Sequence, residues 1–286
     1  MAIRTILAAA SGGSASNGAM GLACQFAHRL NAHVEGFHVI PDRQTLFGAD
    51  GEGFAMMNAA LTDSLLEAGA ANSLKTRAGF DEIVKRHQLA KRNSPTLQHD
   101  GPSACWREET GYAPSLVASR ARFFDLVVLG RSGRVVDEAY THTIEQTLAQ
   151  CGRPVLLAQG EMNDHVGSVV AVAWNGSPQA VRAVGAALPI LATADAITVI
   201  TVGDRKPSDD GLREYLAWHG ITAKFRSVPA VHGRSTGALL LDTASEAAAD
   251  ILVMGGYGHR PWREALFGGV TRDILGSSKM PLLLVH

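Results

Sequence analysis

Two stretches of the chain repeat each other, and each holds an apolar run that stops at a glycine. Asp125–Gly133 reads Asp-Leu-Val-Val-Leu-Gly-Arg-Ser-Gly, and Asp250–Gly258 reads Asp-Ile-Leu-Val-Met-Gly-Gly-Tyr-Gly, 125 positions later. Such a run is typical of a buried parallel strand that enters a turn. The direct interpretation is two copies of one structural unit, each containing this strand.

The beginnings of the two copies are further apart than their ends. Ile6–Gly12 matches Val170–Gly176 with an offset of 164 positions, so the first copy holds about 39 residues that the second lacks. We place this insertion within residues 42–95 and predict that it is mainly helical and lies over the first copy. Gly69 and Gly79 are candidate break points, and we expect no counterpart in the second copy.

Strand and helix patterns alternate through both copies. This alternation predicts an α/β fold of two Rossmann-like, doubly wound domains, each with a five-stranded parallel sheet. The domains span residues 1–160 and 166–286, with a short polar linker between them. Doubly wound sheets bind ligands at the carboxyl ends of their strands, where the strand order reverses.

Composition excludes several classes of function. The chain of 286 residues has a formal net charge of −1, which gives no basic surface for nucleic acid. No apolar stretch reaches the length of a membrane span, and residues 1–10 lack the pattern of a signal peptide. Three cysteines, Cys24, Cys105 and Cys151, are far apart and cannot all pair, which favours a reducing cytoplasm. Neither they nor the 11 histidines have metal-ligand spacing, and no catalytic triad can be assigned.

The stretch from Gly255 to Thr271 resembles the universal stress protein family. That family has the motif G-x2-G-x9-G followed by Ser or Thr, between its fourth strand and fourth helix. Gly255, Gly258 and Gly268 match the motif in type and spacing, and Gly269 stands where nucleotide-binding members have the hydroxyl. The resemblance covers nearly the whole chain and implies the nucleotide-binding α/β fold known as the HUP type, present twice.

The resemblance also implies a nucleotide site in the second copy, for ATP or a related adenine nucleotide with Mg²⁺. Backbone N–H groups and a helix start would meet the phosphates. The family's Asp-Gly-Ser turn corresponds to Asn-Gly-Ser here, and an amide cannot give a metal a carboxylate. A site that binds no cofactor is an equally open interpretation. The residues assigned to the site are Trp174, Asn175, Gly176, Val202, Gly255, Gly258, Gly268, Gly269, Val270 and Thr271.

The first copy departs further from the family motif. Gly130 and Gly133 fit the opening pair, but Thr143 and Ile144 replace the closing pair, and Ser11 replaces the aspartate. We expect branched side chains at the closing pair to crowd a phosphate, so the first copy should hold no ATP site. A scaffold role or another ligand is expected there instead.

These features together predict a tandem universal stress protein that responds to a nucleotide without efficient catalysis, at most with weak ATP hydrolysis. Its two halves should pair through their last strands, Val155–Ala158 and Leu282–Val285, as a pseudo-dimer, and the chain is expected to form a homodimer. One alternative is a scaffold or adaptor of the same fold that needs no nucleotide. Another is an adenylating enzyme, because Ser11–Ser16 resembles the S-G-G-x-D-S loop of ATP pyrophosphatases, with Ala15 in place of its Asp.

Overall fold

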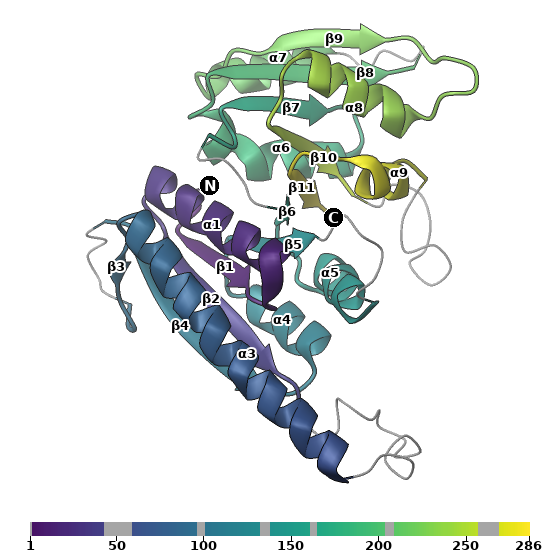
Figure 1. Ribbon diagram of the computed structural model, residues 1–286. Helices are drawn as coiled ribbons and strands as arrows, with labels where there is room; N and C mark the ends of the chain where they lie inside the picture. Colours follow the sequence, from purple (N-terminus) through teal and green to yellow (C-terminus); the bar gives the residue numbers. More distant parts are fainter. Residues whose placement is uncertain are drawn as a thin grey trace.

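The described part of the chain forms one continuous sheet of 11 strands with helices on both faces (Figure 1). The computed structural model describes residues 2–42, 59–95, 101–131, 138–160, 165–203, 209–256 and 269–286. The strand order is β3-β4-β2-β1-β5-β6-β11-β10-β7-β8-β9. The first six positions belong to the first half of the chain and the last five to the second half.

Strands in the first half are buried on both faces. In β1, Ile6 and Ala8 enter one apolar core, whereas Leu7 and Ala9 enter the other. This double burial is the reason that the strand reads as a continuous apolar run. The elements of this half are β1 (Thr5–Ala9), α1 (Gly13–Leu30), β2 (His33–Ile40), α3 (Ala59–Arg86), β3 (Ala90–Lys91), β4 (Ser103–Thr110), α4 (Ala113–Ala121), β5 (Leu126–Arg131), α5 (Glu138–Gln150) and β6 (Val155–Gln159).

The second half repeats this order in shorter form. Its first helix begins at Pro178 as the sequence predicts, and the Ser177 hydroxyl caps it by accepting from Ala180 N–H at 3.2 Å. The elements are β7 (Val169–Ala173), α6 (Pro178–Leu191), β8 (Ala196–Val202), α7 (Asp209–Trp218), β9 (Lys224–Val228), α8 (Thr236–Glu246), β10 (Ile251–Gly255), α9 (Gly269–Ser277) and β11 (Leu282–Val285).

The two halves join through their last strands. β6 pairs antiparallel with β11, with Leu156 opposite Leu283, and every other strand pair is parallel. This confirms the predicted pairing of Val155–Ala158 with Leu282–Val285. Each half contributes the five parallel strands that the sequence predicts, and the first half adds the two-residue strand β3 at the edge of the sheet.

The helices of the described residues cover the sheet in two layers, four on each face. The core on one face receives apolar side chains from α1, α3, α6 and α7. The core on the other face receives them from α4, α5, α8 and α9. The α/β, doubly wound class predicted from the sequence is therefore confirmed. None of the described helices has both the length and the apolar character that a membrane span requires.

The described part of the insertion holds one long helix, α3 (Ala59–Arg86). The 28 residues of α3 run through both Gly69 and Gly79. Neither of these two candidate break points interrupts the helix. The 10-residue α7 holds the corresponding place between the second and third strands of the second half, so α3 is the longer of two corresponding helices. Helix α3 lies along β2 and β4 (Figure 1).

Two arginines of the first half bond to backbone carbonyls of the second. Arg29, near the end of α1, donates to the oxygens of Gly167 at 3.0 Å and Thr193 at 2.6 Å. Arg131, at the end of β5, donates to the carbonyl oxygens of Leu275 and Ser278 near the end of α9. Burial lowers the pKa of Arg131 to about 10, which leaves it charged at neutral pH. These contacts fix the two halves to each other beyond the β6–β11 pairing.

Candidate functional site

The fold gathers most of the predicted site residues at one edge of the second-half sheet. Trp174 and Asn175 follow β7, Val202 ends β8 and Gly255 ends β10. Since β7 pairs in parallel with both β8 and β10, these carboxyl ends lie side by side. The sheet order reverses at β7, where doubly wound folds open a crevice. Gly258 and Gly268 lie outside the described residues.

Gly255 has a packing role that the motif alone does not reveal. A side-chain Cβ at this position would lie 2.6 Å from the carbonyl carbon of Gln179 in the first turn of α6. The first half repeats this contact, because a Cβ at Gly130 would lie 2.2 Å from the oxygen of Ala15 in α1. The first glycine of each motif therefore lets a helix approach the strand end, and it does not itself prove a phosphate contact.

Gly269, Val270 and Thr271 form the first turn of α9. Gly269 is exposed, and a Cβ built there would meet no atom within 4 Å. Its N–H is one of the groups that lack a partner inside the helix. Thr271 is only 5% exposed, so it is largely withdrawn from solvent and is a poorer phosphate contact than the sequence suggested. The open group at this helix start is the backbone of Gly269.

The turn after β7 is shaped by its own side chains. The Asn175 carbonyl oxygen accepts from Ser177 N–H at 3.1 Å, and Gly176 has a φ of 72°, which suits glycine. With its oxygen used in this turn, Asn175 keeps its amide nitrogen as a donor for ribose or phosphate. No acidic group stands at this position to bind a metal directly.

Trp174 has an unsatisfied polar atom beside this turn. Its backbone N–H donates to Ile200 O at 2.9 Å, and its ring is half-buried against the core that α1 and α6 share. The indole Nε1 is buried and has no hydrogen-bond partner among the residues that the structure describes. An unpaired buried N–H is costly, so an acceptor supplied by a ligand or by water would stabilise it.

The first half differs at the position that corresponds to the α9 start. Thr143 and Ile144 lie inside α5, which begins at Glu138, so their N–H groups belong to the interior of a helix. Both side chains are buried, Thr143 to 4% and Ile144 to 9% exposure. The branched side chains are packed away in the protein, and the described residues present no helix start at this position. The absence of an ATP site in the first half stays a prediction.

Helix α3 also covers the turn after β1 in the first half. The Asn72 amide donates to Ser11 O at 3.3 Å, and a Cβ at Gly12 would lie 2.6 Å from the Asn72 oxygen. Nearby, His38 at the end of β2 is 2% exposed and stacks on Trp106 with ring centroids 6.1 Å apart. The crevice edge of this half is therefore filled by the protein's own side chains.

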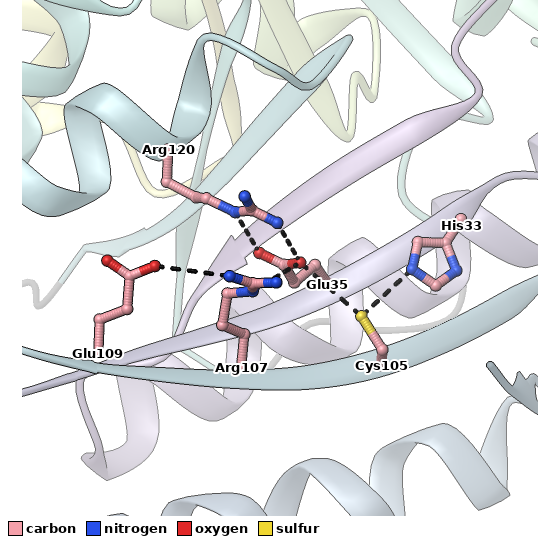
Figure 2. A network of polar contacts seen from close by, with 6 residues as sticks. All are labelled: His33, Glu35, Cys105, Arg107, Glu109 and Arg120. Atoms are coloured by element: carbon pink, nitrogen blue, oxygen red, sulfur yellow. Dashed lines mark hydrogen bonds and ion pairs between the residues drawn. The ribbon is translucent and has the colours of Figure 1, made fainter. Parts of the chain in front are cut away.

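Sequence reasoning missed a polar network on the opposite face of β2 and β4, shown in Figure 2. The buried Glu35 carboxylate accepts two hydrogen bonds from Arg120, each 2.7 Å long, and Arg107 lies 3.6 Å away. Cys105 lies 3.9 Å from Glu35 and 3.3 Å from His33 Nε2. Burial, followed by the Glu35 charge, raises the pKa of Cys105 to about 11, so this thiol is not an activated nucleophile. The parallel β2–β4 pairing brings His33, Glu35, Cys105 and Arg107 together, Arg120 joins them from α4, and no local motif indicates this arrangement.

Metal ligation has no support in the described residues. Within them, no group of three His, Cys, Asp or Glu side chains is arranged to hold a metal ion. The three cysteines are free thiols, and Cys24 and Cys151 are buried. Burial raises the pKa of Cys24 to about 12, as expected for a thiol inside an apolar core.

Comparison with known proteins identifies the second half most directly. Residues 221–286 match the model of the universal stress protein family, and this range contains the whole glycine motif. No curated protein matches the chain.

Solved structures resemble the chain along its whole length. A universal stress protein from Archaeoglobus fulgidus DSM 4304 aligns with a TM-score of 0.71 at 13% identity, covering 98% of this chain and 95% of that one. A protein from Pseudomonas aeruginosa UCBPP-PA14, described as a universal stress protein, aligns with a TM-score of 0.58 at 15% identity over 99% and 93%. Identities this low speak for the fold alone. The sequence match to the universal stress protein family is confined to residues 221–286, and the full-length structural matches show that both halves of this chain share the fold of universal stress proteins.

Proposed function

We propose that this protein binds an adenine nucleotide, ATP or a close relative, at the crevice edge of the second-half sheet, and that it does so without efficient catalysis. The observation that carries the proposal is the family match over residues 221–286, which spans the complete G-x2-G-x9-G motif. Three further features support it: the open backbone at Gly269, the amide of Asn175 and the unpaired indole N–H of Trp174.

The chemistry of these groups suits binding better than reaction. Backbone N–H groups at a helix start hold phosphate oxygens through charge-assisted hydrogen bonds. Asn175 cannot replace a metal-binding carboxylate, so Mg²⁺ would have to be held by the phosphates and water. We therefore place hydrolysis at a weak level at most. The nucleotide would act as a signal, which the folded protein detects by binding it.

One nucleotide per chain is part of this proposal. The first half presents an interior segment of α5 where a helix start is needed, and Asn72 of α3 packs on the turn at Gly12. The same contact weighs against the ATP-pyrophosphatase alternative, because a phosphate would have to displace Asn72 from that loop. Release of pyrophosphate from ATP in the presence of any acceptor substrate would support this alternative.

Substituting Gly269→Ser tests the site. The new hydroxyl fits, since nothing lies within 4 Å of the added Cβ, and it restores the residue that the family motif has at this position. A hydrogen bond to a charged group is worth roughly 1.5–3 kcal/mol, so ATP affinity should rise about ten- to a hundredfold. Titration calorimetry on both proteins measures this change.

Gly276→Ser is the matched control for that substitution. It makes the same chemical change on the same helix at another exposed glycine with open space around it. Both substitutions improve helix propensity, so a general effect on α9 would appear in both. Equal affinities in the two variants would refute the assignment of Gly269 to the phosphate site. Gly268→Val should abolish binding, and ATP binding that survives it would place the site elsewhere.

The scaffold alternative makes a different prediction for stability. A ligand that binds only the native state raises the unfolding temperature, whereas a scaffold that ignores nucleotides shows no shift with ATP. This is the quickest experiment that separates the two functions.

Compartment and assembly belong to the same proposal. Three free thiols are compatible with a reducing cytoplasm, where we expect the protein to act. Homodimer formation stays a prediction, and light scattering of the purified protein measures it. β6 and β11 already pair within the chain, so a homodimer would have to use another surface.

A further inference from the structure

We infer that a second ligand site, for a small phosphate-bearing anion, lies where the two halves meet. A groove of about 460 Å³ is lined by α1 and the end of α3 from the first half, and by residues 165–168 and 193–195 from the second. The C-terminal ends of α1 and α3 lie together at this place (Figure 1). The volume falls within the range of small-molecule sites.

The lining of this groove is rich in cations and donors. Two guanidinium groups and three imidazoles face a single carboxylate; they are Arg29, Arg86, His28, His87, His165 and Asp195. Glutamine amides and hydroxyl groups complete the lining. A guanidinium group can donate two parallel hydrogen bonds and an imidazole one, and such donors suit an anion with several charged oxygens. A metal cation would find almost no charged ligand in this lining.

The two arginines of the groove differ in whether their guanidinium groups already contact other parts of the protein. The guanidinium of Arg29 donates to the carbonyl oxygens of Gly167 and Thr193, and these bonds hold it in position in the groove lining. Arg86 is exposed, and within the described chain no group lies at hydrogen-bond or ion-pair distance from its guanidinium. Arg86 is therefore the cation that can turn to a ligand at the lowest cost.

Helix ends near the groove oppose an anion, since helix C-termini carry partial negative charge. This opposition is weakened because the last carbonyls are already bonded. Ala27 and His28 carbonyls accept from the cap of α1, and the Val84 and Lys85 carbonyls accept from residues after α3. Asp250, which attracts Arg29, accepts from Gly167 N–H at 2.7 Å and is likewise engaged. The exposed positive charge of this lining therefore remains with Arg86.

This groove is separate from the proposed nucleotide site. Ser168 precedes β7 and Asp195 precedes β8, so the groove lies at the amino ends of these strands. The nucleotide residues lie at the carboxyl ends of the same strands. An anion in the groove would contact both halves at once and would stabilise their junction, so its binding can be followed without any nucleotide.

The test uses the full-length protein and inorganic triphosphate as the probe, with ribose 5-phosphate titrated alongside. Calorimetry at low ionic strength should show one bound anion per chain for wild type, and the tighter of the two probes identifies the source as inorganic or organic phosphate. Arg86→Gln should weaken binding about tenfold or more, because one charge-assisted contact is lost.

Lys85→Gln is the matched control, since it removes the neighbouring exposed cation of the same helix turn, which does not line the groove. Its affinity should fall much less than that of Arg86→Gln, because Lys85 does not line the groove and acts on a bound anion only through its charge at longer range. Both variants should unfold at the wild-type temperature without anion, because both side chains are exposed. Equal losses in the two variants, or no binding of either probe to wild type, would overturn the inference.

Discussion

One missing methyl group at the end of a strand decides how closely a helix can approach it. Gly130 and Gly255 do this in the two halves, with Cβ positions that would lie 2.2 Å and 2.6 Å from backbone atoms of α1 and α6. Backbone atoms cannot move aside as a flexible side chain can. The glycines are therefore required by packing in both halves, including the half whose motif has otherwise been lost.

Gly130→Ala and Gly255→Ala should each destabilise the protein. Overpacking of this kind costs typically about 1–3 kcal/mol, and contact with rigid backbone favours the upper end. Urea unfolding measures the loss, and Gly276→Ala is the control because its Cβ meets nothing within 4 Å. If Gly130→Ala were as stable as the control, the close approach of α1 to β5 would be wrong.

At the scale of elements, α3 is attached to the sheet by polar as well as apolar contacts. The Glu108 carboxylate on β4 accepts from Ser73 of α3 and from Trp106, each at 2.7 Å. These two hydrogen bonds, the Ser73 bond first, lower the pKa of Glu108 from its ordinary value of 4.5. Phe80 packs on Trp106 from the same helix, with ring centroids 5.3 Å apart.

Glu108→Gln should destabilise the protein at neutral pH and much less in acid. A carboxylate whose pKa is lower in the folded state stabilises that state above its unfolded pKa, and this contribution is lost as the pH falls through the folded pKa. The difference between wild type and variant should therefore shrink below about pH 4.5. Urea midpoints of both proteins at pH 7 and in acid measure it, and a difference independent of pH would contradict the role given to Glu108.

The elements also show what the sequence could and could not predict. Continuous apolar runs and offset repeats identified the parallel strands, because burial leaves a local pattern. The family resemblance added the pairing of the last strands and the position of the crevice edge. The register of β2 with β4 leaves none, so the cluster around Glu35 was invisible. The same holds for Asn72, whose contact with the Ser11 turn depends on how a 28-residue helix crosses the sheet.

At the scale of the whole molecule, the continuous sheet should make the two halves unfold together. The residues that pair β6 with β11 are all apolar and buried, with Leu156 at 0% and Leu283 at 1% exposure, and Arg29 and Arg131 add bonds across the junction. We expect a single calorimetric transition whose van't Hoff and calorimetric enthalpies agree. Two resolved transitions would show that the halves are energetically independent domains.

The antiparallel contact of β6 with β11 has a consequence for symmetry. When two identical chains associate through such an edge, any substitution is imposed on both sides of the dimer axis. When one chain carries both halves, this restriction is absent, because each half is encoded by its own part of the sequence. The partner half is also always present, whatever the protein concentration. One side can then be closed by a longer helix while the other keeps an open crevice. An assembly that is blocked on one side only is therefore accessible to this chain by single substitutions, but not to a dimer of identical subunits.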